Sequence, residues 1–251
     1  MKLSVIIPFS KELDLINRTI NSVLINSTFF EEVEIIIIND SSIKESQLRI
    51  LFDNNTNKLV KIISNINKKG PGGARNTGLK ISNGDIIAFL DADDFWLPGK
   101  LKAQMREIKN GATFVVTSYR FDNAKIKITP PKSIDKPEDV FLRRGIGTST
   151  VVITKELLEN HKFKDIRFGQ DIDFWFALAN SKKFRYAGIS EIFVEYNSRG
   201  GTTNKFKQLY YLNLVLDINK LNIFLKIRIN IDYIIKGILN FYLKPLFYRK
   251  N

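Results

Sequence analysis

Short apolar runs alternate with helical patterns through residues 1–110, and this alternation restricts the fold more than any other feature. The runs predict strands at Leu3–Ile7, Val33–Ile38, Val60–Ser64 and Asp85–Leu90. Helical spacing of apolar residues between the runs predicts helices at Leu13–Leu24, Lys44–Phe52, Ala74–Ile81 and Pro98–Lys109. A β-α-β order with strands buried on both faces predicts an α/β fold, in which helices cover both faces of a mostly parallel sheet.

Polar residues follow the predicted strands at the point where each strand ends. Pro8-Phe9-Ser10, Asn39-Asp40 and Asp91-Ala92-Asp93-Asp94 are the three clusters of this kind. The carboxyl ends of parallel strands lie at one edge of a sheet, and ligands bind beyond that edge. The sequence therefore predicts a ligand site built from these clusters.

The chain changes character after residue 110 and again near residue 203. The middle part predicts a helix at Asp171–Ala179 and strands at Phe114–Arg120, Lys125–Ile128, Thr150–Ile153 and Phe193–Tyr196, the first two forming a hairpin across Asp122-Asn123. From residue 205 onward the sequence is apolar and basic, with nine Lys and Arg against two Asp. We therefore predict a domain of residues 1–203, with halves 1–110 and 111–203, and a basic amphipathic helical tail of residues 204–251.

The composition excludes several kinds of chemistry. The 251 residues include no Cys and one His, His161, which excludes disulfide scaffolds, thiolate zinc sites and multi-histidine metal sites. Catalysis would therefore rest on carboxylates. The net charge of +13 favours an anionic partner, such as a nucleotide, a nucleic acid or a lipid headgroup. The first apolar run is shorter than a signal peptide requires, so we expect a cytoplasmic protein.

Asp91 and Asp93 are the residues best suited to bind a metal ion. In an extended chain these two carboxylates point the same way, and their hard oxygens suit Mg²⁺ or Mn²⁺ bound together with substrate phosphates. The alternative is a solvated turn in which Asp94 caps the next helix. Asp40 either binds a ligand or forms a local turn, and Arg75 either binds a phosphate or pairs with a carboxylate.

Four segments, taken together, resemble a known family. They are Ser4-Val5-Ile6-Ile7-Pro8, Ile37-Ile38-Asn39-Asp40-Ser41-Ser42, Gly70-Pro71-Gly72-Gly73-Ala74-Arg75-Asn76-Thr77-Gly78 and Phe89-Leu90-Asp91-Ala92-Asp93-Asp94. In this order they resemble the nucleotide-sugar half of family 2 glycosyltransferases, which have the GT-A fold. The resemblance covers Lys2 to about Lys109 and extends to about Arg199. It implies an inverting, metal-dependent enzyme of the bacterial surface-polysaccharide or lipopolysaccharide type.

The resemblance also implies how a UDP-sugar would be bound. Pro8 and Ser10 would line the base pocket, and Asp40 would bind the uracil edge. Arg75 would support the base or the diphosphate. These roles are expectations carried over from matching motif positions.

The metal and the catalytic base are implied in the same way. Asp93 would be the direct ligand of Mn²⁺ or Mg²⁺, and Asp91 would contact the ribose or a water bound to the metal. In the family a Glu-Asp pair that opens a helix supplies the base; here the pair is Gln170-Asp171, so the first acid is missing. Asp171 is therefore assigned as the general base that deprotonates the acceptor hydroxyl, whose direct attack inverts the anomeric configuration.

The acceptor is expected to be a hydroxyl group of a glycan or a lipid-linked glycan. The family has a flexible loop over the nucleotide near residues 196–203, often with a His, and Arg199 would take its electrostatic role here. Arg143-Arg144 lie where the acceptor site would be built. They either meet an anionic acceptor, such as a lipid-linked diphosphate, or are solvated.

Three interpretations of the tail remain open. It packs on the catalytic domain as ordinary helices, it forms a homodimer, or it anchors the protein on the cytoplasmic face of the inner membrane. Two other functions are also considered: a non-catalytic nucleotide-sugar-binding protein, and a nucleic-acid-binding protein. The second is disfavoured because the excess positive charge lies in the apolar tail, whereas the predicted cleft is acidic.

Overall fold

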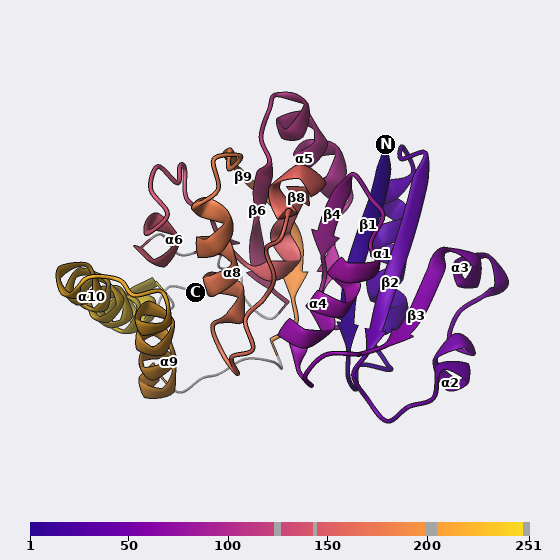
Figure 1. Ribbon diagram of the computed structural model, residues 1–251, viewed down its shortest axis with the longest axis horizontal. Helices are drawn as coiled ribbons and strands as arrows, with labels where there is room; N and C mark the ends of the chain where they lie inside the picture. The colour runs from indigo at the N-terminus through magenta and orange to yellow at the C-terminus, as the bar shows by residue number, and fades with distance from the viewer. Residues whose placement is uncertain (123–126, 143–144, 199–204, 248–251) are drawn as a thin grey trace. The chain divides into compact units, whose positions relative to one another are not determined.

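The computed structural model describes residues 1–122, 127–142, 145–198 and 205–247, and it divides into two compact units, residues 1–200 and 201–251. Within the described residues, the first unit is built on a nine-stranded sheet (Figure 1). The second contains helices α9 (Lys205–Ile218) and α10 (Ile223–Phe247). No helix in the described part of the chain combines the length and the apolar character needed to cross a membrane. The boundary predicted at residue 203 lies outside the described residues and stays a prediction.

The part of the sheet formed by residues before 90 is parallel, as predicted. Its strands lie in the order β3 (Val60–Ser64), β2 (Glu32–Asn39), β1 (Lys2–Phe9) and β4 (Ile86–Phe89). Ile6 of β1 lies opposite Ile36 of β2 and Phe89 of β4. Because neighbouring strands run in the same direction, the residues that follow them lie at one edge of the sheet.

The second half of the chain adds antiparallel pairs, so the whole sheet is mixed. β8 (Val151–Thr154) lies antiparallel between β4 and β6 (Phe114–Phe121), and β9 (Tyr186–Tyr196) runs parallel to β6. β7 (Lys127–Ile128) pairs with β6 as the predicted hairpin, although residues 123–126 lie outside the described residues. β9 begins earlier than predicted.

Helices cover both faces of the sheet, which confirms the predicted fold class (Figure 1). α1 (Ile16–Ser27) and α5 (Lys100–Lys109) belong to the core that includes Val5 and Ile7 of β1. α8 (Gln170–Ala179) belongs to the core on the other face, which includes Ile6. Because alternate residues of a strand point to opposite faces, β1 contributes to both cores.

α4 (Pro71–Ile81) packs closely on β1 because residue 78 is glycine. A Cβ atom at this position would lie 2.4 Å from Cγ2 of Ile6, far inside van der Waals contact. The helix starts at Pro71, three residues earlier than predicted, since proline at the first helical position lacks an N–H that would have no partner anyway. The glycine-rich segment is therefore the first turn of this helix, not a loop before it.

The remaining differences concern the ends of two helices and several short segments. The helix predicted at Leu13–Leu24 is α1, which lies three residues later, and the helix predicted at Pro98–Lys109 begins at Lys100. The helix predicted at Lys44–Phe52 is α2 (Glu45–Arg49), which is followed by a separate α3 (Asn54–Leu59). Four elements were not predicted: β5 (Phe95–Trp96), α6 (Asp139–Leu142), the 3₁₀ turn η1 (Thr148–Thr150) and α7 (Lys155–Leu158). Segments of two to four residues are too short to display either period by which sequence patterns are recognised.

Lys100 at the start of α5 is fully buried. Its Nζ atom donates a hydrogen bond of 2.8 Å to Oε1 of Gln104 and lies 4.0 Å from the centre of the Trp96 ring. Burial lowers the pKa of this amine well below its ordinary value of 10.5. The folded protein therefore holds the Lys100 proton less tightly than the unfolded chain does.

We expect the free energy of unfolding to increase with pH between the lowered pKa of Lys100 and 10.5, because there the unfolded chain binds a proton that the folded protein lacks. Lys100→Met should remove this part of the pH dependence, and Lys102→Met, at an exposed position of the same helix, should keep it. Urea unfolding of the three proteins at neutral and alkaline pH measures the effect. An unchanged pH dependence in Lys100→Met would contradict it.

Candidate functional site

A cavity of about 1520 Å³ lies at the edge of the sheet where β1, β2 and β4 end. Every predicted site residue that the structure describes lines it: Pro8, Ser10, Asp40, Arg75, Asp91, Asp93 and Asp171. Arg199, Arg143 and Arg144 lie outside the described residues. The fold thus brings together side chains that are up to 163 positions apart in the sequence, from Pro8 to Asp171.

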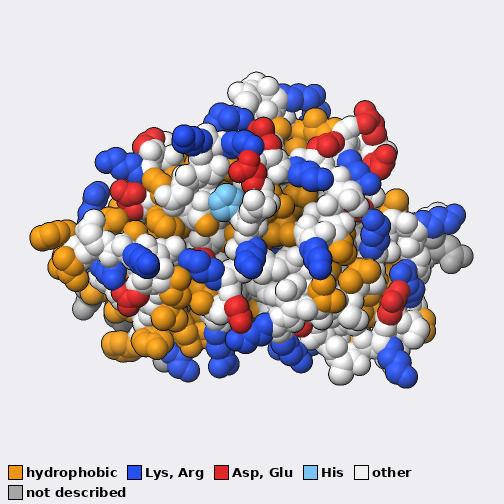
Figure 2. Space-filling view, viewed as in Figure 1, with side chains coloured by type: hydrophobic (Ala, Val, Ile, Leu, Met, Phe, Trp, Pro, Cys, Tyr) orange, Lys and Arg blue, Asp and Glu red, His pale blue; other side chains and the backbone are white. Residues whose placement is uncertain are grey.

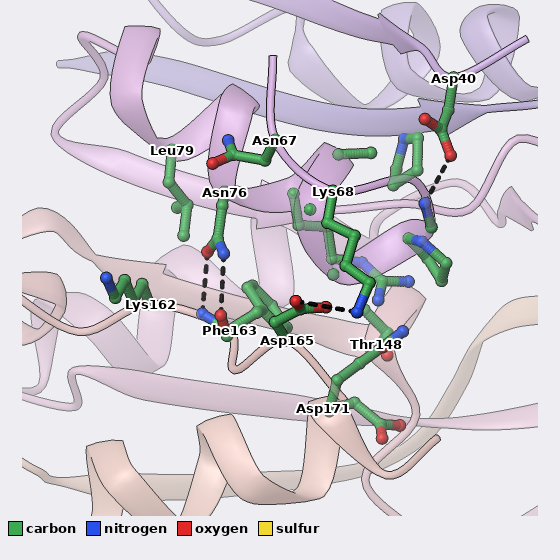
Figure 3. Close-up of a pocket in the computed structure, with 18 of the residues that line it drawn as sticks. Asp40, Asn67, Lys68, Asn76, Leu79, Thr148, Lys162, Phe163, Asp165 and Asp171 are labelled. Atoms are coloured by element: carbon green, nitrogen blue, oxygen red, sulfur yellow. Dashed lines mark hydrogen bonds and ion pairs between the residues drawn. The ribbon is translucent and has the colours of Figure 1, made fainter. Parts of the chain in front are cut away.

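Asp40 shapes the wall of the cavity next to β2. Its Oδ2 accepts a hydrogen bond of 2.7 Å from the backbone N–H of Gly70 (Figure 3). Its Oδ1 accepts one of 2.8 Å from Nδ2 of Asn65. Gly70 has φ +127°, a conformation that residues with a side chain rarely adopt. Asp40 therefore fixes the glycine turn that precedes α4, and each oxygen keeps a second lone pair for a ligand.

Arg75 is buried in the second turn of α4 and forms an ion pair with Asp91. Nη2 of Arg75 lies 2.5 Å from Oδ1 of Asp91, and its guanidinium carbon lies 5.6 Å from the centre of the Phe163 ring. Arg75 was predicted either to bind a phosphate or to pair with a carboxylate, and the structure contains the pairing with a carboxylate. Its positive charge holds the Asp91 carboxylate in place at the rim of the cavity.

The acidic segment after β4 is a turn. The backbone N–H of Asp94 donates a hydrogen bond of 3.1 Å to the carbonyl oxygen of Asp91. The extended chain assumed for Asp91-Ala92-Asp93 was therefore wrong, because this turn hydrogen bond folds the backbone back on itself. Asp91 and Asp93 nevertheless line the same cavity.

Asp94 is a buried residue that the sequence analysis considered only as a helix cap. Its carboxylate accepts hydrogen bonds from Oγ of Ser149 at 2.6 Å and from the backbone N–H of Asn197 at 3.0 Å. Burial raises the pKa of Asp94 well above its ordinary value, and the negative charge of Asp91 adds a smaller effect in the same direction. The next helix begins at Lys100 with Gly99 as its N-cap, so Asp94 fastens the acidic turn to distant segments instead of capping α5.

The donor set at Asp91 and Asp93 fits a divalent cation that a substrate helps to bind. Burial raises the pKa of Asp93, and the neighbouring charge of Asp91 adds to this effect, so a cation between the carboxylates would relieve both. Among the described residues, no group of three or more His, Asp or Glu side chains is placed to hold a metal ion. Mg²⁺ is commonly held by one or two carboxylates together with water and substrate phosphates, and two carboxylates meet that requirement.

Asp171 enters the cavity from the first turn of α8. Gly169, with φ 75°, is the N-cap of this helix, Gln170 is its first residue and Asp171 its second. A Cβ atom on Gly72 would lie 3.2 Å from Oε1 of Gln170, so the Gln170 amide packs against the first turn of α4. Asp173 is buried and pairs with Nζ of Lys164 at 2.9 Å, which is a structural role.

Tyr119 on β6 is a residue near the site that the sequence analysis did not single out. Burial, and then the charges of Asp171 and Asp94, raises the pKa of its hydroxyl to about 12. Tyr119 therefore stays neutral at physiological pH beside two carboxylates. The sequence gives no sign that Tyr119 lies near the site. It is an aromatic residue in a strand, and the carboxylates near it, Asp171 and Asp94, belong to α8 and to the acidic turn.

Residues 161–169 form the wall of the cavity opposite β2 and are tied to the first half of the chain. Nδ2 of Asn76 donates to the carbonyl oxygen of Phe163, and the N–H of Phe163 donates to Oδ1 of Asn76, both at 2.8 Å (Figure 3). Nζ of Lys68 lies 3.0 Å from Oδ2 of Asp165, with both side chains exposed. The Asn76 pair is thus the more protected of the two links, since exposed ion pairs contribute little.

Comparison with known proteins decides the family. Residues 4–171, more than half of the chain, match Glycosyl transferase family 2. The chain belongs to glycosyltransferase family 2. This glycosyltransferase is 29% identical over 241 residues to the UDP-Glc:alpha-D-GlcNAc-diphosphoundecaprenol beta-1,3-glucosyltransferase WfgD of Escherichia coli, with 94% of this chain and 93% of WfgD covered.

A second relative and a solved structure agree with this family. The glycosyltransferase is 28% identical over 226 residues to the GalNAc(5)-diNAcBac-PP-undecaprenol beta-1,3-glucosyltransferase of Campylobacter jejuni, covering 85% of this chain and 71% of the relative. The crystal structure of S. aureus TarS 1-349 in complex with UDP-GlcNAc superposes with a TM-score of 0.67 at 19% identity, covering 93% of this chain and 72% of TarS. That likeness supports the GT-A fold, and the chain is a glycosyltransferase of that fold.

The Asn76→Ala variant of this glycosyltransferase should lose both hydrogen bonds to Phe163. We expect its free energy of unfolding to fall by about 1–3 kcal/mol, because a partly buried carbonyl and a partly buried N–H lose their partner. Transfer should fall as well, since residues 161–169 carry the wall of the cavity up to α8. Urea unfolding and a transfer assay measure the two effects. Asn160→Ala, at an exposed position directly before this wall, is the matched control, and equal stability of both variants would contradict the role of Asn76.

Proposed function

We propose that this glycosyltransferase is an inverting, metal-dependent enzyme that moves a sugar from a UDP-sugar to a hydroxyl of a lipid-linked glycan. The observation that carries the proposal is the position of Asp91, Asp93 and Asp171 on one cavity, two of them after β4 and the third at the start of α8. An acidic pair and a separate carboxylate are what a displacement at a sugar diphosphate needs. The pair offsets charge with a cation, and the single carboxylate accepts a proton.

The nucleotide would occupy the side of the cavity near β1 and β2. Pro8 and Ser10 stand at the end of β1, and Asp40 fixes the adjoining glycine turn. This arrangement supports the proposed uracil pocket. Arg75 contributes by holding Asp91 at 2.5 Å, so its effect on the diphosphate is exerted through that carboxylate. A divalent cation bound by Asp91 and Asp93 would offset the negative charge that develops on the leaving diphosphate.

Asp171 would act as the general base. It would take the proton of the acceptor hydroxyl as that oxygen attacks the anomeric carbon on the side opposite the diphosphate. A single displacement forms the new glycosidic bond, breaks the bond to the diphosphate and inverts the configuration. Gln170, a neutral amide in place of the expected acid, leaves Asp171 as the carboxylate of this pair.

The acceptor is proposed from the relatives. WfgD and the Campylobacter jejuni enzyme both carry a diphosphoundecaprenol or PP-undecaprenol acceptor in their names. A lipid-linked glycan in surface-polysaccharide synthesis is therefore the proposed acceptor class, and the protein would work at the cytoplasmic face of the membrane. Arg143, Arg144 and Arg199 remain proposed contacts of the anionic substrates.

A transfer assay tests the proposal. The purified chain is incubated with UDP-glucose, Mn²⁺ and a GlcNAc-diphosphate lipid, and the anomeric configuration of the product is read by NMR. A β-linked product formed from the α-linked donor supports the proposal, and retention of configuration would overturn the inverting mechanism. If UDP-sugars raise the melting temperature but no acceptor gives turnover, the chain is a non-catalytic nucleotide-sugar-binding protein.

A further inference from the structure

Polar side chains connect the two helices of residues 205–247. The amides of Asn213 on α9 and Asn230 on α10 donate to each other at 2.9 and 2.8 Å. Oη of Tyr233 donates to Oε1 of Gln208 at 2.7 Å, and Lys226 forms an ion pair with Asp217. The side of α10 that faces α9 is therefore rich in hydrogen-bonding groups.

The opposite side of α10 is apolar and exposed. We call it the isoleucine stripe; its residues, each 47–82% exposed, are Ile223, Phe224, Ile227, Ile231, Ile234 and Ile235. Spacings of three and four residues place these side chains on one face along more than three turns. Figure 2 shows hydrophobic side chains exposed over this part of the molecule.

This arrangement reverses the usual pattern of paired helices in water. Soluble helices bury their apolar stripe and expose their polar face. Here Asn230, Lys226 and Tyr233 make hydrogen bonds and an ion pair with α9. Three apolar residues of the two helices, Val215, Leu216 and Ile229, are also buried, and the isoleucine stripe is exposed. Polar contacts between helices with apolar outer faces are the arrangement found where the surroundings are lipid.

Charge favours an anionic membrane as the partner of the stripe. Arg228 is exposed at the edge of the stripe, Lys220 is exposed in the turn between the helices, and residues 205–251 contain nine Lys and Arg against two Asp. Basic residues beside an apolar face bind anionic headgroups while the apolar side chains enter the acyl boundary. A second copy of the chain would bring the same positive charge to this face.

We infer that the isoleucine stripe of α10 lies in the interface of an anionic lipid bilayer and holds the enzyme on that surface. The biological reason for this binding rests on the proposed function, because a lipid-linked acceptor lies at the surface of a membrane. Its structural basis is independent of the cavity, because it depends only on residues of α9 and α10.

Vesicle flotation of the full chain tests the inference. Wild type should float with vesicles of phosphatidylcholine and phosphatidylglycerol, and less with phosphatidylcholine alone. Ile227→Asp/Ile231→Asp should weaken binding to the mixed vesicles by about tenfold or more, because two side chains no longer enter the acyl boundary and two negative charges face anionic headgroups. Arg228→Glu should weaken binding to the mixed vesicles and leave binding to phosphatidylcholine alone unchanged.

Ile50→Asp, at an isoleucine that is 82% exposed in the first unit, is the matched control and should bind vesicles like wild type. Thermal melting and the rise in melting temperature with UDP-glucose report whether each variant is folded. Equal flotation of wild type and the double aspartate variant would overturn the inference. The inference would also be overturned if the wild type formed a dimer in sedimentation equilibrium, the double variant were monomeric, and neither bound vesicles. Vesicle binding without a response to UDP-glucose would contradict the proposed function and leave the stripe assignment standing.

Discussion

Asp171→Asn is expected to lower kcat by about 10²–10⁴-fold, the contribution of a general base, with little change in KM for the UDP-sugar. Asparagine has the same shape as aspartate and occupies the second position of α8 without strain, but it cannot take the proton from the hydroxyl group of the acceptor glycan. The position of Asp171 on the cavity, beyond Gly169 and Gln170, is the structural reason for this expectation. Steady-state kinetics with varied UDP-sugar measure kcat and KM separately.

Asp14→Asn is the matched control for this variant, because Asp14 is exposed. It should keep kcat within about twofold of wild type, as surface substitutions usually do. A kcat for Asp171→Asn within the same range would remove Asp171 as the base. A large rise in KM with unchanged kcat would make Asp171 a binding residue.

Asp93→Asn is expected to reduce transfer by roughly 10²-fold or more, because a divalent cation would lose a carboxylate ligand that offsets charge on the diphosphate. In the presence of EDTA the variant should melt at the same temperature as wild type or higher. The reason is that burial and the charge of Asp91 disfavour the ionised Asp93 side chain. Isothermal titration of Mn²⁺ in the presence of UDP measures the loss of metal binding directly.

The two readouts of Asp93→Asn separate a ligand role from a structural one. A variant that melts lower than wild type in EDTA and keeps its affinity for Mn²⁺ would argue that Asp93 stabilises the acidic turn and binds no metal. Asp165→Asn serves as the control, since Asp165 is an exposed carboxylate that lines the same cavity and pairs with Lys68. It should change neither the affinity for Mn²⁺ nor the melting temperature appreciably.

Local chemistry explains how much of the site could be predicted from the sequence. The apolar runs that end near Pro8, Asp40 and Asp91 identify strands, and parallel strands bring the residues after their carboxyl ends to one edge of the sheet. Asp171 was found because it opens a helix in a segment that resembles a family motif. Each of these inferences depends on neighbours within a few residues along the chain.

Asp94, Arg75 and Tyr119 show what local patterns could not predict. Asp94 is buried against Ser149 and Asn197, which are 55 and 103 residues away in the sequence. Arg75 pairs with Asp91 of the acidic turn, although the sequence also left phosphate binding open. The raised pKa of Tyr119 depends on burial and on carboxylates from two other segments.

The sequence by itself determined the parallel half of the sheet, the edge at which the acidic residues gather and the family resemblance. It did so because apolar periodicity and motif spacing are properties of contiguous residues. Only the tertiary structure decided which charges are paired, which carboxylates are buried and which side of α10 is left apolar and exposed. Those properties depend on contacts between segments far apart in the chain, and burial changes the free energy of a charge only once those contacts are made.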